Sequence, residues 1–315
     1  MNTQYPRLPA ALIFNPASGA ADDGDNFDAR LHEALGGVQI EATGFQAKDD
    51  GELASATARA RDLGVQLVIV CGGDGTIETV ANGLVNSGLT LGILPAGTRN
   101  NLAASLNIPT DLSAAAELLR SGTPRPIDAV LAACGGHERW FFELFTAGLL
   151  TDVFNDAEAL QKCNWGALGD LVAKFVGASP STLHLALADD EGEHLAIETE
   201  AHAVLAMNTP YLGANFRMAD DIQYDDGCLD VFLYAGLNKL DLLAQGLAVA
   251  TDGSPDPRIR RLRARRLTLR ADPPVPLLVD GVNLGEGPAT LQVHRAALKV
   301  IAGQAPQAQQ QDLKQ

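Results

Sequence analysis

The stretch that most constrains the fold of this chain runs from Leu67 to Glu78 and reads LVIVCGGDGTIE. Its apolar start, Leu67–Cys71, predicts a buried strand, and residues 76–86 carry apolar side chains at helical spacing. Between them the chain turns on glycines around one carboxylate, Asp74. Glycine lets the backbone approach an anion, and the free N–H groups of a helix start point toward that anion. The stretch therefore predicts a strand, a turn and a helix that can cradle a phosphate group.

Asp74 has two explanations at this stage. A carboxylate in a phosphate-binding turn repels its ligand unless a divalent cation lies between them or the acid contacts a ribose, so Asp74 indicates a metal–nucleotide site. The structural alternative is a tight turn in which Asp74 caps the helix that follows. From this segment alone we weigh the two about equally, because single glycine-rich matches are often accidental.

Two further strands end in polar, glycine-containing turns. The strand at 10–14 runs into Asn15–Gly19, and the strand at 90–94 runs into Pro95–Leu102. Helices expected near 25–35, 51–63 and 111–119, with a strand at 38–43, alternate with these strands. This alternation predicts a parallel sheet covered on both faces, with ligands bound at the carboxyl ends of the strands. The three turns are expected to converge on one edge of the sheet, which favours a nucleotide site.

The pattern changes after the segment 121–126, which we interpret as a domain boundary. Clean alternation, as in Ser181–Ala188, predicts antiparallel and half-buried strands. Strands are expected at 127–133, 139–145, 181–188, 194–207 and 228–234, with helical inserts at 151–176 and 239–250. The predicted organisation is an α/β nucleotide-binding domain at 1–126, a β-rich domain at 127–302 and a disordered tail at 303–315.

Composition limits the function classes. The chain has 315 residues and a net charge of −16, so two domains are expected and nucleic acid is disfavoured as a partner. Apolar runs stay below the roughly 18 residues of a membrane span, and the N-terminus lacks the features of a signal peptide. The four cysteines are scattered, which is typical of buried thiols in a reducing compartment and disfavours zinc. The cytoplasm is the expected location.

An arginine-rich stretch stands out in this acidic chain. In an extended segment, Arg261, Arg263 and Arg265 share one side, opposite Leu262 and Ala264. The stripe either rests on phospholipid headgroups or is the charged face of an edge strand, neutralised by surface acids.

Taken together, the motifs resemble a known family. Asn15-Pro16-x-Ser18-Gly19, Gly72-Gly73-Asp74-Gly75-Thr76 and Leu94-Pro95-x-Gly97-Thr98-x-Asn100 look like the catalytic domain of diacylglycerol kinases. More closely, the chain resembles soluble bacterial lipid kinases related to sphingosine and ceramide kinases. The likeness continues, in the family's order, through Ile127-Asp128, Asp225-Asp226-Gly227 and Val279-Asp280-Gly281.

The resemblance implies an α/β nucleotide domain, then a β-sandwich-like domain with helical insertions, with ATP and a lipid meeting in the cleft between them. Asp74 would reach the catalytic Mg²⁺. A structural Mg²⁺ is implied at Asp226, with the main-chain oxygens of Gln223 and Cys228. The implied ATP contacts are Asn15, Ser18, Thr43, Gly72, Gly73, Asp74, Gly75, Thr76, Gly97, Thr98 and Asn100.

Some positions depart from the family pattern. The glutamate that takes the proton from the lipid hydroxyl is replaced by Val282, which cannot accept one, and the acid after Asn100 is replaced by Asn101. Asp280 is therefore the expected surviving catalytic carboxylate. Glu286, between two glycines, is either a substitute base or a solvated turn residue.

We expect an ATP- and Mg²⁺-dependent kinase of a lipid hydroxyl that associates peripherally with a membrane. A homodimer is a possible assembly. One alternative is a soluble-substrate kinase such as NAD kinase, which shares Gly72–Gly75; the Gly97–Asn100 element and the Asp226 loop speak against it. Another is a catalytically weak nucleotide- or lipid-binding regulator, motivated by Val282 and Asn101. Diacylglycerol, ceramide and sphingoid-like lipids all stay open as substrates.

Overall fold

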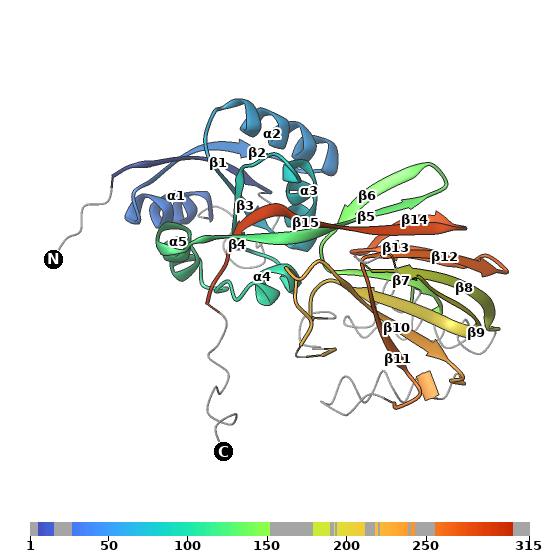
Figure 1. The fold of residues 1–315 in the computed structure, drawn as a ribbon. Coiled ribbons are helices and arrows are strands. Elements are labelled where there is room, and N and C mark those ends of the chain that lie inside the picture. The colour runs from blue at the N-terminus through green and yellow to red at the C-terminus, as the bar shows by residue number, and fades with distance from the viewer. Residues whose placement is uncertain are drawn as a thin grey trace, which may run out of the picture. The chain divides into compact units, whose positions relative to one another are not determined.

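The computed structural model describes residues 6–15, 27–151, 179–189, 192, 194–211, 218–219, 221–238, 241–242 and 256–304. Their contacts divide the chain into two compact units, Met1–Ile127 with Ala296–Gln315, and Asp128–Arg295 (Figure 1). Almost all of the helical insert expected at 151–176, most of the one at 239–250 and the tail beyond 304 lie outside the described residues. Among the described residues, no helix is both long and apolar enough to cross a membrane.

The first unit is built on a parallel sheet. Its strands pair in the order β15–β4–β3–β1–β2, and all of these neighbours are parallel. β3 is buried along its whole length, as expected for a parallel strand covered on both faces. The strands are β1 (Leu8–Phe14), β2 (Ile40–Gln46), β3 (Leu67–Gly72), β4 (Thr90–Pro95) and the C-terminal part of β15 (Ala289–Ile301).

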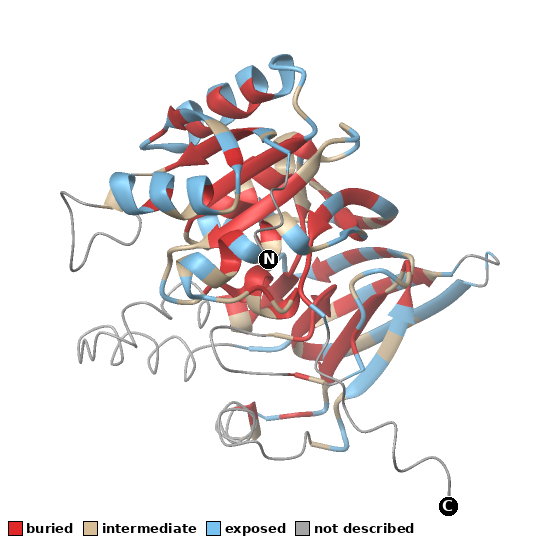
Figure 2. Cartoon of the chain, turned by 90° about the vertical axis from the view of Figure 1, so that its left-hand side faces the viewer, coloured by how far each residue is buried: buried red, intermediate tan, exposed pale blue. Residues whose placement is uncertain are grey.

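Helices cover both faces of this sheet. α2 packs on α3 and α1 packs on α5. The chain moves outward in the sheet from β1 to β2, and then back across β1 to β3 and on to β4. Connections between parallel strands are right-handed, so this reversal of direction puts α1 on one face of the sheet and α2 and α3 on the other. The helices bury their inner sides and expose their outer sides (Figure 2). They are α1 (Phe27–Gly37), α2 (Asp50–Asp62), α3 (Asp74–Leu84), α4 (Asn101–Ser105) and α5 (Leu112–Ser121).

The second unit is an antiparallel sheet assembly. β9 is its central strand, pairing with β7, β8 and β10, while β11 pairs only with β10 among the described strands. Alternate residues of β8 and β12 are buried in its apolar core. The strands are β5 (Pro124–Cys134), β6 (His137–Phe141), β7 (Leu144–Gly148), β8 (Ser181–Ala188), β9 (His194–Met207), β10 (Leu229–Ala235), β11 (Arg260–Ala264), β12 (Arg266–Asp272), β13 (Pro276–Val279), β14 (Val282–Glu286) and the first part of β15.

The predicted fold class is confirmed: an α/β domain is followed by a β-rich one. Three details differ from the expectations. The segment expected at 139–145 forms two strands, because the chain turns at Phe142–Glu143. β5 already begins at Pro124, inside the segment interpreted as a boundary. The last strand returns to the first unit, because Lys299 and Val300 pair with β4.

Candidate active site

The ends of β1, β3 and β4 lie side by side in the first unit. β3 pairs with β1 on one side and with β4 on the other, all parallel, so their carboxyl ends share one edge. The N–H of Asn15 donates to the Cys71 oxygen at 3.4 Å, and the N–H of Ala96 donates to the Gly72 oxygen at 2.9 Å. The expected convergence is confirmed for Asn15 and for the turns after β3 and β4; residues 16–19, with Ser18, lie outside the described residues.

The two glycine turns touch backbone to backbone. A Cβ on Gly97 would lie 2.6 Å from the Cα of Gly73, and a Cβ on Gly72 would lie 2.6 Å from the Cβ of Thr76. Such distances are sterically prohibited, so neither Gly97 nor Gly72 can carry a side chain without moving its neighbour. Glycine at position 97 lets the two turns approach backbone to backbone, and glycine at position 72 leaves room for the Thr76 side chain of its own turn. Glycine turns of this kind are typical of phosphate sites.

Asp74 joins these two turns. Its Oδ2 accepts a hydrogen bond from the N–H of Asn100 at 3.0 Å, and its Oδ1 accepts one from the N–H of Asn101 at 2.8 Å. The structural alternative, in which Asp74 caps its own helix, is wrong, because Gly73 is the N-cap of α3. The Asp74 carboxylate instead satisfies the first N–H groups of α4, on the neighbouring turn.

The second turn is closed by its own asparagine. Asn100 adopts a left-handed conformation with φ of 52°. Its Oδ1 accepts from the N–H of Gly97 at 2.9 Å, and its Nδ2 donates to the Gly97 oxygen at 2.7 Å. Asparagine tolerates positive φ better than most residues, so Asn100 both shapes and closes this turn.

The oxygens beside Asp74 fit a magnesium–nucleotide group. Burial raises the pKa of Asp74, while the Asn101 and Asn100 N–H groups and Arg99 counteract this shift. Its carboxylate keeps lone pairs beyond the two hydrogen bonds. The adjacent Asn101 is only 8% exposed, and its Oδ1 has no hydrogen-bond partner within the protein. Hard oxygen ligands of this kind suit Mg²⁺, which also keeps waters and phosphate oxygens as ligands.

The remaining predicted nucleotide residues are placed as follows. Thr98 and Gly75 are exposed, and Thr76 is buried. Thr43 is also exposed, but it lies within β2, which runs on to Gln46, and not at the end of that strand. Thr43 is paired with Ala11 of β1.

In the second unit, Asp280 holds a turn. Its carboxylate accepts hydrogen bonds from the N–H groups of Phe142 at 2.7 Å, Leu144 at 2.8 Å and Glu143 at 3.1 Å. Asp280 itself has φ of 42°, and its N–H donates to the Leu144 oxygen at 3.0 Å. Burial raises the pKa of Asp280 to about 6, with the three N–H groups acting in the opposite direction. Asp280 therefore fixes the turn between β6 and β7.

Glu286 is distant from this carboxylate along the hairpin. β14 pairs with β13 so that Val282 lies opposite Val279 and Glu286 lies opposite Pro276. Because each strand residue advances about 3.3 Å, Glu286 is about 13 Å along β14 from Val282. Glu286 is exposed and belongs to a strand, which argues against a substitute base and favours the interpretation of a solvated residue.

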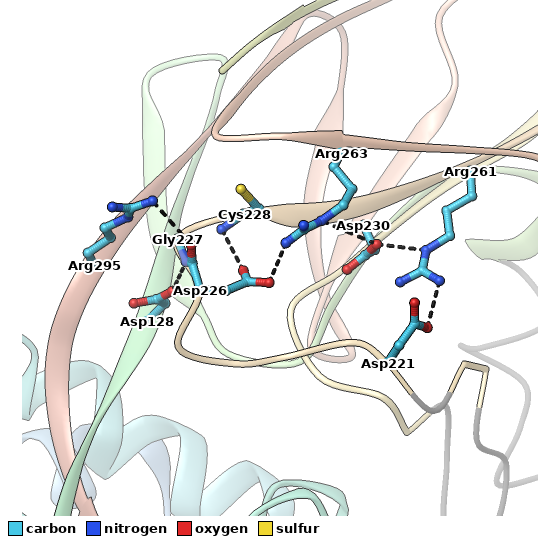
Figure 3. A network of polar contacts seen from close by, with 9 residues as sticks. All are labelled: Asp128, Asp221, Asp226, Gly227, Cys228, Asp230, Arg261, Arg263 and Arg295. Carbon is cyan, nitrogen blue, oxygen red and sulfur yellow. Dashed lines mark hydrogen bonds and ion pairs between the residues drawn. The ribbon is translucent and has the colours of Figure 1, made fainter. Parts of the chain in front are cut away.

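The loop before β10 is held by side chains (Figure 3). Asp226 accepts a hydrogen bond from the N–H of Cys228 at 3.0 Å and forms an ion pair with Arg263. Asp128, which is 2% exposed, accepts from the N–H of Gly227 at 2.6 Å. Arg295 donates to the Asp226 main-chain oxygen at 3.1 Å.

These contacts do not fit the structural Mg²⁺ that the resemblance implied at Asp226, Gln223 and Cys228. The guanidinium of Arg263 already neutralises the Asp226 carboxylate. Arg263 therefore supplies the positive charge beside Asp226 for which the expected ligand set required a metal ion.

The arginine stripe is also largely paired within its own unit. Arg261 donates from Nε to Asp230 and from a terminal nitrogen to Asp221, both at 2.7 Å. Asp230 is 1% exposed, and its burial raises its pKa despite the Arg261 hydrogen bond. β11 pairs only with β10 among the described strands, so Arg261 and Arg263 lie on an edge strand, which favours the interpretation of a neutralised, charged edge.

Sequence reasoning missed the role of Asp230. It lies in the otherwise apolar run of β10, directly opposite Arg263 in the register of β10 and β11. An acid inside a buried strand needs a cationic partner, and the arginine-rich stretch could have supplied that signal.

Comparisons with known proteins agree with this geometry. Residues 9–132 match the diacylglycerol kinase catalytic domain, and residues 164–302 match the YegS C-terminal NAD kinase beta sandwich-like domain. A diacylglycerol kinase of Bacillus subtilis is 28% identical, with 86% of this chain and 89% of that protein covered. A Stenotrophomonas maltophilia protein named probable lipid kinase YegS-like is also 28% identical, with 86% and 88% covered.

The fold has solved counterparts. The crystal structure of a diacylglycerol kinase from Bacillus anthracis superimposes with a TM-score of 0.73 at 22% identity, covering 94% of this chain and 97% of that one. At this identity the likeness concerns the fold. The two domain matches, in this order, identify residues 9–132 as a diacylglycerol kinase catalytic domain and residues 164–302 as a YegS C-terminal domain, and relatives that match along most of the chain are named diacylglycerol kinase and YegS-like lipid kinase.

Proposed function

We propose that this chain transfers the γ-phosphoryl group of ATP to a hydroxyl of a membrane lipid. The observation that carries the proposal is the Asp74 carboxylate, which bonds the N–H groups of Asn100 and Asn101 and so joins two glycine turns at one sheet edge. The Bacillus subtilis relative is named diacylglycerol kinase, which supports an acylated alcohol as the acceptor.

The residues of the first unit have separate tasks in this proposal. The glycines at positions 72, 73 and 97 leave room for the ATP phosphates beside the backbone, and the exposed Thr98 adds a hydroxyl donor. The Gly97 N–H donates within its own turn, to Asn100. Asp74 and Asn101 would hold Mg²⁺, which neutralises phosphate charge when bound. Because little covalent chemistry is required of the protein in phosphoryl transfer, this positioning accounts for much of the expected rate enhancement.

The acceptor determines where the reaction takes place. A lipid with long acyl chains stays in the bilayer, so the kinase has to meet it at the membrane surface from the cytoplasm. We propose peripheral association without assigning it to the arginine stripe, since Arg261 and Arg263 are paired with acids of their own unit.

A second candidate is a kinase of a soluble substrate. The match of residues 164–302 is to a domain described as NAD kinase beta sandwich-like, which favours NAD as the alternative acceptor. A third candidate is a nucleotide- or lipid-binding regulator, because Val282 cannot accept a proton and Asn101 brings no charge to a metal.

One assay separates these candidates. The chain is incubated with Mg²⁺ and γ-labelled ATP, and with diacylglycerol, ceramide, sphingosine or undecaprenol in mixed micelles, or with NAD in solution. Label in a lipid supports the proposal, label in NAD alone supports the soluble-substrate kinase, and ATP binding without transfer supports the regulator. Asp74→Asn should lower transfer at least about 100-fold, because it removes charge where phosphate and metal charge are balanced. Asp62→Asn, at an exposed carboxylate on α2, is the matched control; equal activity of both variants would refute the site.

A further inference from the structure

Two arginines of β11 approach one buried acid of β10. Asp230, which is 1% exposed, accepts a hydrogen bond from Nε of Arg261 at 2.7 Å, and Nε of Arg263 lies 3.9 Å from the same oxygen. In the register of β10 and β11, Arg263 is directly opposite Asp230, and Arg261 is two residues away on the same side of β11. The Asp230 carboxylate therefore has one cation in hydrogen-bond contact and a second at ion-pair distance.

The guanidinium of Arg263 lies between two carboxylates (Figure 3). One of its terminal nitrogens forms the ion pair with Asp226, and its Nε faces Asp230. A guanidinium is planar and rigid, so one group of fixed shape is in ion-pair contact with both acids. Burial raises the pKa of Asp230, the Arg261 and Arg263 guanidiniums lower it, and the nearby charge of Asp226 raises it further. Asp226 and Asp230 thus act on one another across the cation that they share.

The charges of this network do not cancel. Arg261 binds Asp230 through Nε and Asp221 through a terminal nitrogen, both at 2.7 Å. Asp221, Asp226 and Asp230 carry three negative charges, and Arg261 and Arg263 carry two positive ones, so the net charge is −1. Without Arg263 the net charge becomes −2, and the two acids lose the cation between them. A divalent ion supplies the charge that such a gap requires.

We propose that Asp226 and Asp230 form a cation site of the second unit, in which the Arg263 guanidinium takes the place of a divalent metal ion. Mg²⁺ is commonly bound by one or two carboxylates, with water completing its shell, so these two acids are a sufficient set of protein ligands once the guanidinium is removed. The native chain keeps this site closed to metal, because its own cation is always present. It follows that the second unit folds without divalent ions, and that any effect of Mg²⁺ on the chain arises elsewhere.

The test compares melting temperatures of the full chain, without nucleotide, in EDTA and in rising concentrations of MgCl₂ at constant ionic strength. Arg263→Ala should melt about 3–6 °C higher when Mg²⁺ is about tenfold above its Kd, since a ligand that binds only the folded state stabilises that state. The wild-type chain should show no such shift. Isothermal titration should detect one more bound Mg²⁺ per chain for Arg263→Ala than for the wild type.

Two further variants locate the effect. Arg260→Ala, at an exposed arginine of the same strand, should respond to Mg²⁺ like the wild-type chain. Arg263→Ala combined with Asp226→Asn should lose the response to Mg²⁺, because one of the two ligand carboxylates is then neutral. A response that persists in this double variant would overturn the inference, since the ion would bind elsewhere.

Equal responses of the wild-type chain and Arg263→Ala would also overturn it, whether Mg²⁺ stabilises both chains or neither. If Arg263→Ala is unfolded in EDTA, circular dichroism replaces the melting experiment. Recovery of the folded spectrum when Mg²⁺ is added supports the site, and a chain that stays unfolded refutes it. These outcomes are independent of lipid phosphorylation, so they do not decide the proposed kinase function.

Discussion

Arg263 on β11 forms an ion pair with Asp226 in the loop that leads into β10. The same carboxylate caps the N–H of Cys228, and Arg295 binds the Asp226 main-chain oxygen. Arginine side chains and a backbone N–H thus pair with the Asp226 oxygens of a loop for which the family resemblance implied a magnesium ion. The loop should consequently keep its structure without divalent metal.

The first prediction concerns this ion pair. Arg263→Gln should destabilise the chain by about 0.2–1 kcal/mol, because Arg263 is half-exposed and such pairs contribute little in water. Wild-type thermal denaturation should be unchanged by EDTA. Arg260→Gln, an exposed arginine of the same strand, serves as control and should melt like wild type. If the melting temperature of the wild-type chain dropped when EDTA was added, the loop would depend on a metal ion, and the conclusion that Arg263 takes the place of that ion would be contradicted.

The second prediction concerns the contact of the glycine turns. Gly97→Ala places a methyl group 2.6 Å from the Cα of Gly73, so the turns have to separate. We expect destabilisation of about 1–3 kcal/mol by overpacking and a loss of ATP affinity of more than tenfold. Gly36→Ala, in α1 with no atom near its added Cβ, should instead stabilise by about 0.5–1 kcal/mol. Urea unfolding and nucleotide titration measure both effects; unchanged ATP binding by Gly97→Ala would exclude this turn from the site.

The third prediction concerns pH. The pKa of Asp280 is raised from 3.8 to about 6 in the folded chain. The folded state therefore binds a proton more tightly than the unfolded state, so this group's stabilising contribution is complete below its unfolded pKa and is lost as pH rises through about 6. Asp280→Asn should flatten the decline in unfolding free energy between about pH 4 and 6. Urea unfolding at closely spaced pH values tests this, and an Asp280→Asn curve parallel to wild type would disprove the raised pKa.

The fourth prediction concerns Thr98, whose side chain is exposed at the second turn. Thr98→Ala should raise the KM for ATP by roughly fivefold to tenfold, equivalent to one hydrogen bond of about 1 kcal/mol, without changing stability. Thr98→Ser keeps the hydroxyl and should behave like wild type. Equal KM values for all three chains would exclude Thr98 from ATP binding.

Much of the fold could be predicted from local patterns. The buried run of β3, the alternation of β8 and the polar turns each depend on residues close together in the chain, and periodicity reveals them. β15 was not predicted as a strand that returns to the first unit. Its last residues pair with β4 about 200 residues earlier in the chain, and only long-range packing selects that partner.

The sequence by itself determined the α/β class, the glycine turns and the order of the family motifs, because these depend on residue type and short spacing. Tertiary structure alone decided which partner each charged group has. The Asp74 carboxylate accepts hydrogen bonds from N–H groups 26 and 27 residues later in the chain. The Asp280 carboxylate accepts hydrogen bonds from the N–H groups of a turn that lies 136 to 138 residues earlier. A carboxylate has no partner of its own in the local sequence; its hydrogen bonds and its pKa are set by whichever N–H groups and cations the folded backbone brings within about 3 Å.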